Sequence, residues 1–160
     1  MKEGLHIRRL SALAIMAAMP TRAQVEKVAM RTTGISCGIC AGLSEIYFRR
    51  LPGVDKVKIS LSSEAIMLTF KPGATFDPEA IRKILEPLKV GVVQFQIGAR
   101  GEVLENGRKG FLIAGRDKFA LLDAIDSPAV PHNVLVRIEG ILFDRARPME
   151  LKVLTFKPLQ

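Results

Sequence analysis

The sequence predicts an α+β protein, with a βαββαβ unit in its first half and an all-β unit in its second half. In the first half, alternating apolar residues indicate four strands, and two apolar stripes at helical spacing lie between them. The second half holds only short strand-like runs separated by turn residues. A chain of 160 residues, with 48% hydrophobic and 25% charged residues, is typical of a globular protein of one or two domains.

The strands of the first half show the period of two that is typical of a half-buried sheet. The predicted strands are 25–33, 55–62, 65–70 and 92–98. In the first of them, Val28, Met30 and Thr32 alternate with residues that we expect to face the other way. The second and third lie so close together that they predict a hairpin.

The two helices are predicted from their apolar stripes and their end signals. The first, 40–51, has four apolar residues on one face, which we expect to be buried. These residues are Leu43, Ile46, Tyr47 and Leu51. The second helix is predicted to begin after Asp77, which is a typical N-cap residue, with Pro78 at its first position. A second apolar stripe follows these two residues. The resulting order is that of a ferredoxin-like unit, in which two helices cover one face of a four-stranded antiparallel sheet.

Residues 99–160 are predicted to form a separate small all-β module, so that the first domain spans 25–98. The strand-like runs are 101–105, 108–115, 117–123, 134–143 and 150–159. Short strands with turn residues between them predict a small closed barrel or a sandwich, and we favour an OB-like barrel.

Residues 1–24 have the layout of an export signal. A positive front precedes an apolar run, Leu10–Met19, whose ten residues are too few for a bilayer-spanning helix of about 20. We expect cleavage near Ala23 or Gln24, a periplasmic or secreted mature protein, and no stable membrane insertion after signal removal. The net charge of +8 favours anionic partners, but an exported protein is not expected to meet nucleic acid. We read the basic side chains as a solvated surface.

Cys37 and Cys40 are the two cysteines of the chain, and they form a C-x-x-C motif. Cys37 falls in the loop after the first predicted strand, and Cys40 falls in the first turn of the first predicted helix. A helix N-terminus stabilises thiolates, and thiolates select soft cations such as Cu(I), Hg(II) and Zn(II). A closed structural zinc site needs four ligands, but the expected mature chain holds one histidine, His132, in its second half. Two sulfurs suit Cu(I) or Hg(II), and they stay open to another protein's thiolate.

Two other readings of the cysteine pair remain open. Export would place the thiols in an oxidising compartment, so the protein could be a thiol-disulfide redox protein or an interaction module with a structural disulfide. The chain has no Trp, which usually precedes the first cysteine of a thioredoxin-like site. A disulfide that closes so short a loop gains little stability. No arrangement typical of an enzyme is found in the sequence, and we expect none.

Residues 25–98 resemble the heavy-metal-associated domain family, which includes copper chaperones, the metal-binding domains of copper ATPases and the periplasmic mercury-binding protein. The family motif Gly-Met-x-Cys-x-x-Cys corresponds to the stretch GISCGIC, 34–40, and the family's Leu-Pro-Gly-Val corresponds to 51–54. This resemblance implies that Cys37 and Cys40 are the metal ligands. It also implies that the metal is Cu(I), with Hg(II) or Zn(II) as alternatives, and that it passes to a metal-transfer partner such as a membrane transporter.

The chain departs from the family pattern at two positions. Ile35 stands where the family usually has a methionine that packs beneath the metal loop. Val92 follows Gly91 where family members often have an aromatic residue or a lysine close to the metal, and Lys89 is out of register with that position.

Overall fold

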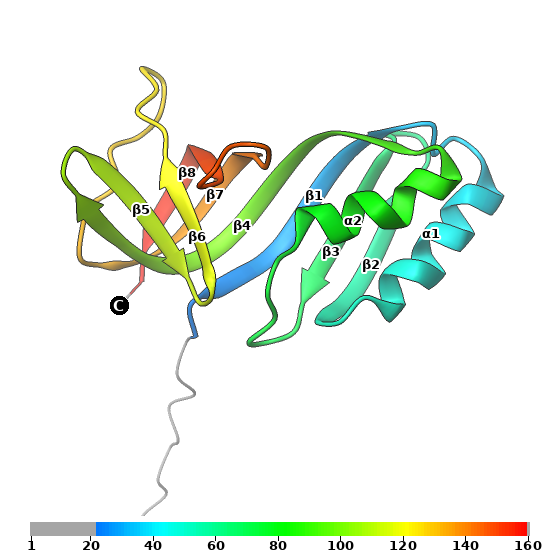
Figure 1. Cartoon of the computed structure of the whole chain (residues 1–160), viewed down its shortest axis with the longest axis horizontal. Helices are drawn as coiled ribbons and strands as arrows, with labels where there is room; N and C mark the ends of the chain where they lie inside the picture. The colour runs from blue at the N-terminus through cyan, green and yellow to red at the C-terminus, as the bar shows by residue number, and fades with distance from the viewer. Residues whose placement is uncertain (1–21, 160) are drawn as a thin grey trace, which may run out of the picture.

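The computed structural model describes residues 22–159, so the predicted export signal, 1–24, lies almost wholly outside the described residues. Within this range the chain folds into one eight-stranded sheet with helices on part of one face (Figure 1). The elements of the first half are β1 (Gln24–Thr33), α1 (Gly38–Arg50), β2 (Val54–Ser60), β3 (Ala65–Phe70), α2 (Pro78–Leu85) and the 3-10 helix η1 (Glu86–Leu88). They are followed by β4 (Gly91–Asn106), β5 (Lys109–Ala114), β6 (Asp117–Leu121), β7 (Leu135–Phe143) and β8 (Glu150–Pro158).

The first half is the predicted ferredoxin-like unit. Strands β2, β3, β1 and β4 lie side by side in that order and pair antiparallel, and α1 and α2 cover one face of them (Figure 1). The strand alternation is confirmed by burial of the residues Val28, Met30, Thr32, Ile66, Leu68 and Phe70. The N-cap of α2 is also confirmed, because the Asp77 carboxylate accepts the N–H groups of Glu79 and Ala80 at 2.9 and 3.0 Å.

The prediction for the buried face of α1 is wrong. The helix buries Ser44 and Phe48, and three of the four residues expected in the core are exposed instead. These are Leu43, Ile46 and Tyr47, at 37%, 47% and 41% exposure. The fourth, Leu51, is half-buried. A buried serine is tolerated here because its hydroxyl donates to the carbonyl of Cys40 at 2.8 Å and is therefore not left unpaired.

The expectation of separate strands at 92–98 and 101–105 is also wrong, since β4 runs through both without a break. Its glycines permit close approach of neighbouring strands and do not mark a turn. A Cβ atom at Gly101 would collide with the carbonyl oxygen of Ile113 in β5, and one at Gly98 would lie 2.6 Å from Cε of Lys27 in β1. Pairing with β1 along one edge and with β7 along the other keeps the strand continuous.

The strands of the second half form a closed ring of pairings. β4 pairs with β5, β5 with β6, β6 with β8, β8 with β7, and β7 with β4 again. The contact of β6 with β8 is parallel, and the others are antiparallel. The predicted strand-like runs correspond to the second part of β4 and to β5 to β8. Buried apolar side chains fill the inside, namely Val103, Leu112, Phe119, Val136, Ile138, Leu151 and Val153.

The two halves share strand β4, a continuous apolar core and several polar contacts. The buried carboxylate of Asp117 in β6 accepts the N–H of Phe76, which precedes α2, at 3.1 Å. Glu26 of β1 forms ion pairs with Arg100 of β4 and Arg137 of β7. The expected boundary between 98 and 99 therefore falls inside a strand, and the division into two domains stays a prediction. Across the described residues, each helix is too short or too polar to cross a bilayer.

Candidate metal centre

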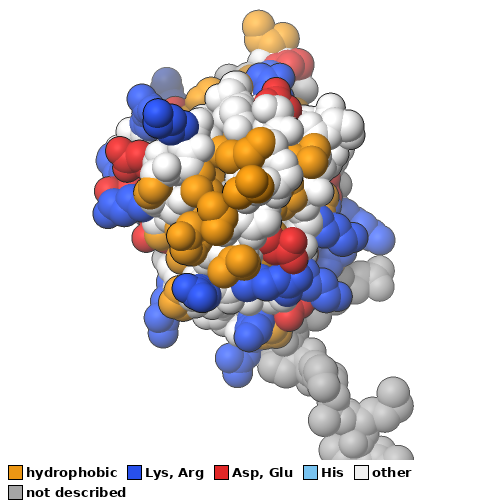
Figure 2. Space-filling model, turned by 90° about the vertical axis from the view of Figure 1, so that its right-hand side faces the viewer, with side chains coloured by type: hydrophobic (Ala, Val, Ile, Leu, Met, Phe, Trp, Pro, Cys, Tyr) orange, Lys and Arg blue, Asp and Glu red, His pale blue; other side chains and the backbone are white. Residues whose placement is uncertain are grey.

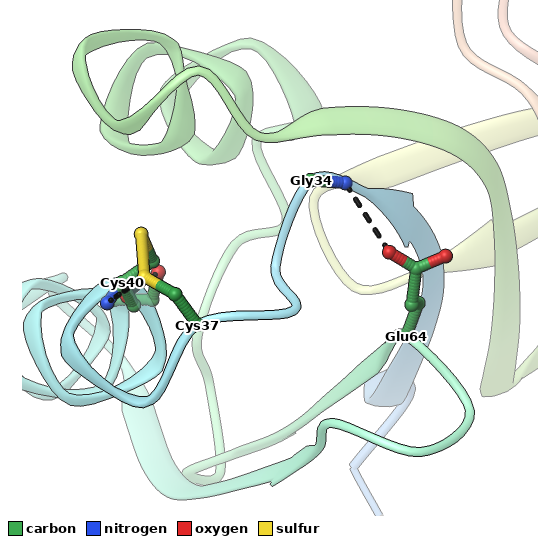
Figure 3. The surroundings of a disulfide bond; sticks show 5 residues. Gly34, Cys37, Cys40 and Glu64 are labelled. Atoms are coloured by element: carbon green, nitrogen blue, oxygen red, sulfur yellow. Dashed lines mark hydrogen bonds between the residues drawn. A yellow bond between two sulfur atoms is a disulfide. The ribbon is translucent and has the colours of Figure 1, made fainter.

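Cys37 and Cys40 lie together at the N-terminus of α1 (Figure 3). Cys37 is the N-cap residue, with extended backbone angles, and its Sγ accepts the N–H of Cys40 at 3.0 Å. The structure joins the two residues by a disulfide bond, with their Cα atoms 5.4 Å apart. Both sulfurs therefore occupy the end of the helix at which the backbone N–H groups favour negative charge.

The pair is open to solvent on one side. Cys37 is exposed and Cys40 is half-buried, and the residues around them, Ser36, Gly38 and Ile39, are exposed as well. A reductant, a metal ion or the side chain of another protein can thus reach the sulfurs without any movement of the fold.

The loop before Cys37 is held by a close backbone approach. Gly34 has a φ of +85°, and a Cβ atom built on it would lie 2.8 Å from the carbonyl oxygen of Lys89. Lys89 itself has a left-handed backbone, with a φ of 54°, at the end of η1. Glycine is needed at position 34 both for its backbone angle and for the space, so the loop conformation depends on it.

Glu64 in the turn between β2 and β3 supports the same loop from the other side. Its carbonyl oxygen accepts the N–H of Thr32 at 2.8 Å and the Thr32 hydroxyl at 2.7 Å. Its carboxylate accepts the N–H of Gly34 at 3.3 Å, and Figure 3 shows this side chain pointing to the glycine. We expected only a turn in this segment. Nothing in the sequence separates Glu64 from an ordinary solvated turn residue.

Ile35 packs beneath the loop, at the position where the resembled family usually has methionine. It is fully buried in the same apolar cluster as Phe48 of α1. The departure from the family motif therefore keeps an apolar anchor below the cysteines. Val92, at the second departure, is half-buried, and its carbonyl oxygen accepts the Arg82 guanidinium at 3.2 Å.

Other candidate ligands are not gathered at this site. His132 lies in the segment before β7, where its Nδ1 is 3.2 Å from a carboxylate oxygen of Glu105. Between residues 22 and 159, no group of three or more His, Cys, Asp and Glu side chains is arranged to hold a metal ion. The sulfur pair is thus a two-ligand candidate, and such a site favours a soft ion with low coordination number.

The fold and the site define a class: a ferredoxin-like domain with a C-x-x-C pair at the start of its first helix. Comparison with known proteins finds one relative that supports the resemblance predicted for 25–98. A probable copper-exporting P-type ATPase of Archaeoglobus fulgidus is 32% identical over 74 residues, which are 46% of this chain. The resemblance to heavy-metal-associated domains is thereby confirmed. The chain spans only 9% of that ATPase, and no family model matches.

Solved structures with a similar region include the CopZ metallochaperone and CopA from Bacillus subtilis. The likeness to CopZ covers 42% of this chain and 98% of that protein, with 18% identity and a TM-score of 0.38. The likeness to CopA covers 44% of this chain and 92% of the compared chain, with 30% identity and a TM-score of 0.37.

Proposed function

We propose that this protein binds Cu(I) through Cys37 and Cys40 and passes the ion to a partner protein. The observation that carries the proposal is the position of the two sulfurs, side by side at the exposed N-terminus of α1. The similarity to a probable copper-exporting ATPase supports copper as the ion. Hg(II) accepts the same two-sulfur geometry, whereas Zn(II) prefers four ligands and fits less well.

Binding requires the reduced form of the pair. Two thiols of a reductant convert the Cys37–Cys40 disulfide to two thiols and are themselves joined as a disulfide, so two electrons and two protons enter the protein. Cu(I) then replaces the two thiol protons and is held between two thiolates. Because only two protein ligands surround it, a thiolate of a partner can add as a third ligand. The partner's second sulfur would then take the place of one cysteine of this chain, and the ion would pass to the partner once the bond to the remaining cysteine also breaks and both cysteines take up protons again.

We also propose that the protein is exported, as its N-terminal sequence indicates, and that the recipient is a membrane transporter or another exported protein. Strand β1 begins at Gln24, so cleavage before this residue would leave every described strand intact. The second half is proposed to be an OB-like barrel. Its strand order β4-β5-β6-β8-β7 and the parallel contact of β6 with β8 support this assignment.

The disulfide itself favours a second candidate function, a thiol-disulfide redox protein. In that case the pair would exchange electrons with a partner's thiols and would not need to retain a metal. The two functions differ in whether reduced protein holds Cu(I) against a competitor.

The test is mass spectrometry under native conditions on reduced protein with one equivalent of Cu(I) and a competing chelator. The wild type is expected to retain one ion, and Cys37→Ser and Cys40→Ser to lose it, because a single thiolate cannot chelate. His132→Ala is the matched control and is expected to retain the ion. Equal retention by the wild type and Cys37→Ser would refute the site. A wild type that retains no ion but exchanges disulfides with thiols would favour the redox function.

A further inference from the structure

An apolar surface extends along α1 directly from the cysteine pair. Its members are Ile39, Leu43, Ile46 and Tyr47, which we call the apolar strip, with exposures of 78%, 37%, 47% and 41%. Their spacing places them on one face of the helix. Figure 2, which views the molecule from the α1 side, shows hydrophobic side chains gathered on this surface, with basic side chains and some acidic ones around them.

The strip continues into a hollow between the C-terminal end of α1 and the helix α2. The hollow has a volume of about 320 Å³ and is lined by Tyr47, Leu51, Pro52, Ile84 and Pro87. Arg50 and Lys83 also line it. The hollow is large enough to accept one apolar side chain, and the strip offers a contact surface beside it.

The protein's own core does not account for these exposed side chains. The inner face of α1 is packed by Phe48, and Ile35 fills the space below the loop. Large apolar side chains that gather on an exposed surface are typical of a contact site for another molecule. Ile39 lies between the two cysteines in the chain, so a molecule that covers the strip also covers the sulfurs.

We propose that the apolar strip and the hollow dock the copper recipient, through an apolar segment of that partner with carboxylates on its flanks. This inference rests on the proposed function. The charges around the hollow favour an acidic partner over a second copy of this chain. Arg49 and Lys83 are paired with Glu45 and Glu79 on their own helices. Arg50 has no ion-pair partner among residues 22–159, and a carboxylate of the docked segment would supply one. A second copy would instead place another Arg50 near the same contact.

The experiment uses reduced, metal-free protein and three fluorescent helical peptides as probes. One peptide has a leucine stripe flanked by glutamates, the second has the same stripe flanked by lysines, and the third has glutamates but glutamine in place of leucine. We expect the first peptide to bind most tightly. Leu43→Glu and Ile46→Glu are expected to weaken its binding by about tenfold or more, because each places a charge in the apolar contact. Arg50→Glu is expected to reverse the preference between the first and second peptides.

Leu104→Glu is the matched control, since Leu104 is a 40% exposed leucine on β4. It is expected to bind the first peptide as the wild type does. No binding of the first peptide, equal binding of the glutamate and lysine peptides, or wild-type binding by Leu43→Glu would overturn the proposal. Sedimentation that shows a wild-type dimer and a monomeric Leu43→Glu would also overturn it, in favour of a second copy.

Copper retention by the same variants separates this inference from the proposed function. Leu43→Glu and Ile46→Glu are expected to retain Cu(I) like the wild type while they lose the peptide. A wild type that binds the first peptide but retains no Cu(I) would refute the copper function, and with it the identity of the docked partner as a recipient.

Discussion

The guanidinium of Arg82 in α2 and the carboxylate of Asp144, which follows β7, form a two-point ion pair with distances of 2.9 and 3.0 Å. The guanidinium carbon also lies 5.0 Å from the ring centre of Phe95 in β4. The two charged side chains are only 29% and 13% exposed. A helix of the ferredoxin-like half is thus fixed to a loop of the barrel half, close to the strand that both halves share.

Replacing Asp144 by alanine is expected to lower the free energy of unfolding by about 1–3 kcal/mol, because it leaves the Arg82 guanidinium partly buried without its carboxylate. Urea unfolding followed by far-UV circular dichroism measures the change. Arg49→Ala is the control, since its ion pair with Glu45 is much more exposed, at 56% and 44%. That change is expected to cost less than about 1 kcal/mol. Equal losses in both variants would contradict the distinction between the two pairs.

Asp117 predicts a pH dependence of stability. Burial raises the pKa of this carboxyl above its ordinary value of 3.8, the hydrogen bond from Phe76 lowers it in part, and the charge of Asp77 raises it further. Between pH 3.8 and the raised pKa, the unfolded chain has released a proton that the folded chain keeps. The contribution of Asp117 to stability therefore falls as the pH rises through this window, and it stays lower above it.

Asp117→Asn keeps an oxygen acceptor for the Phe76 N–H and removes the charge. It is expected to gain stability relative to the wild type as the pH rises from about 4 to 7, with no relative gain below this range. Urea unfolding of both proteins across this range gives the difference. Asp126→Asn is the control: the hydrogen bond from Lys152 lowers the pKa of Asp126 below 3.8, so its contribution to stability changes only at lower pH, and this variant should show no such trend between about pH 4 and 7. If the stability of Asp117→Asn relative to the wild type decreases as the pH rises, the pKa of Asp117 is not raised.

Gly34→Ala is expected to destabilise the loop before Cys37. Its φ of +85° and the carbonyl oxygen of Lys89 at 2.8 Å leave no room for a methyl group. The left-handed angle alone costs about 1–2 kcal/mol for alanine. Gly42→Ala is the matched control, since this α1 glycine has open space around its Cβ position and should gain about 1 kcal/mol of helix stability. Thermal unfolding of both variants measures the effects, and a Gly34→Ala protein as stable as the wild type would contradict the close approach.

The sequence alone predicts those elements whose signals come from residues that are neighbours in the chain. The alternation of Val28 and Met30 and the cap at Asp77 each depend on neighbouring residues, and the structure has them as predicted. The place of the cysteine pair, after a strand and at the start of a helix, follows from the same local signals.

The features that the sequence did not predict depend on contacts that exist only in the folded chain. The apolar residues of α1 suggested the wrong inner face, because the true one includes Ser44, whose hydroxyl finds a partner only once the helix exists. Gly101 was expected to begin a separate strand, whereas it lies inside β4 and permits the close approach of β5, whose Ile113 is twelve residues later. Glu64 contacts Gly34 across the loop at a distance in sequence that no periodicity can indicate.

Oxidation of the cysteine pair is expected to abolish copper binding. In the disulfide form each sulfur is bonded to the other, and neither can act as a thiolate ligand. Protein titrated with mixtures of reduced and oxidised glutathione should retain Cu(I) in proportion to the fraction with two free thiols. Thiol alkylation with mass spectrometry measures that fraction, and retention against a chelator is read on the same samples. Ile39→Ala is the control, since this 78% exposed side chain lies between the cysteines but supplies no ligand. Copper held by the fully oxidised protein would show that the ion is bound elsewhere. Loss of binding in parallel with the thiols would support the assignment of both sulfurs as ligands.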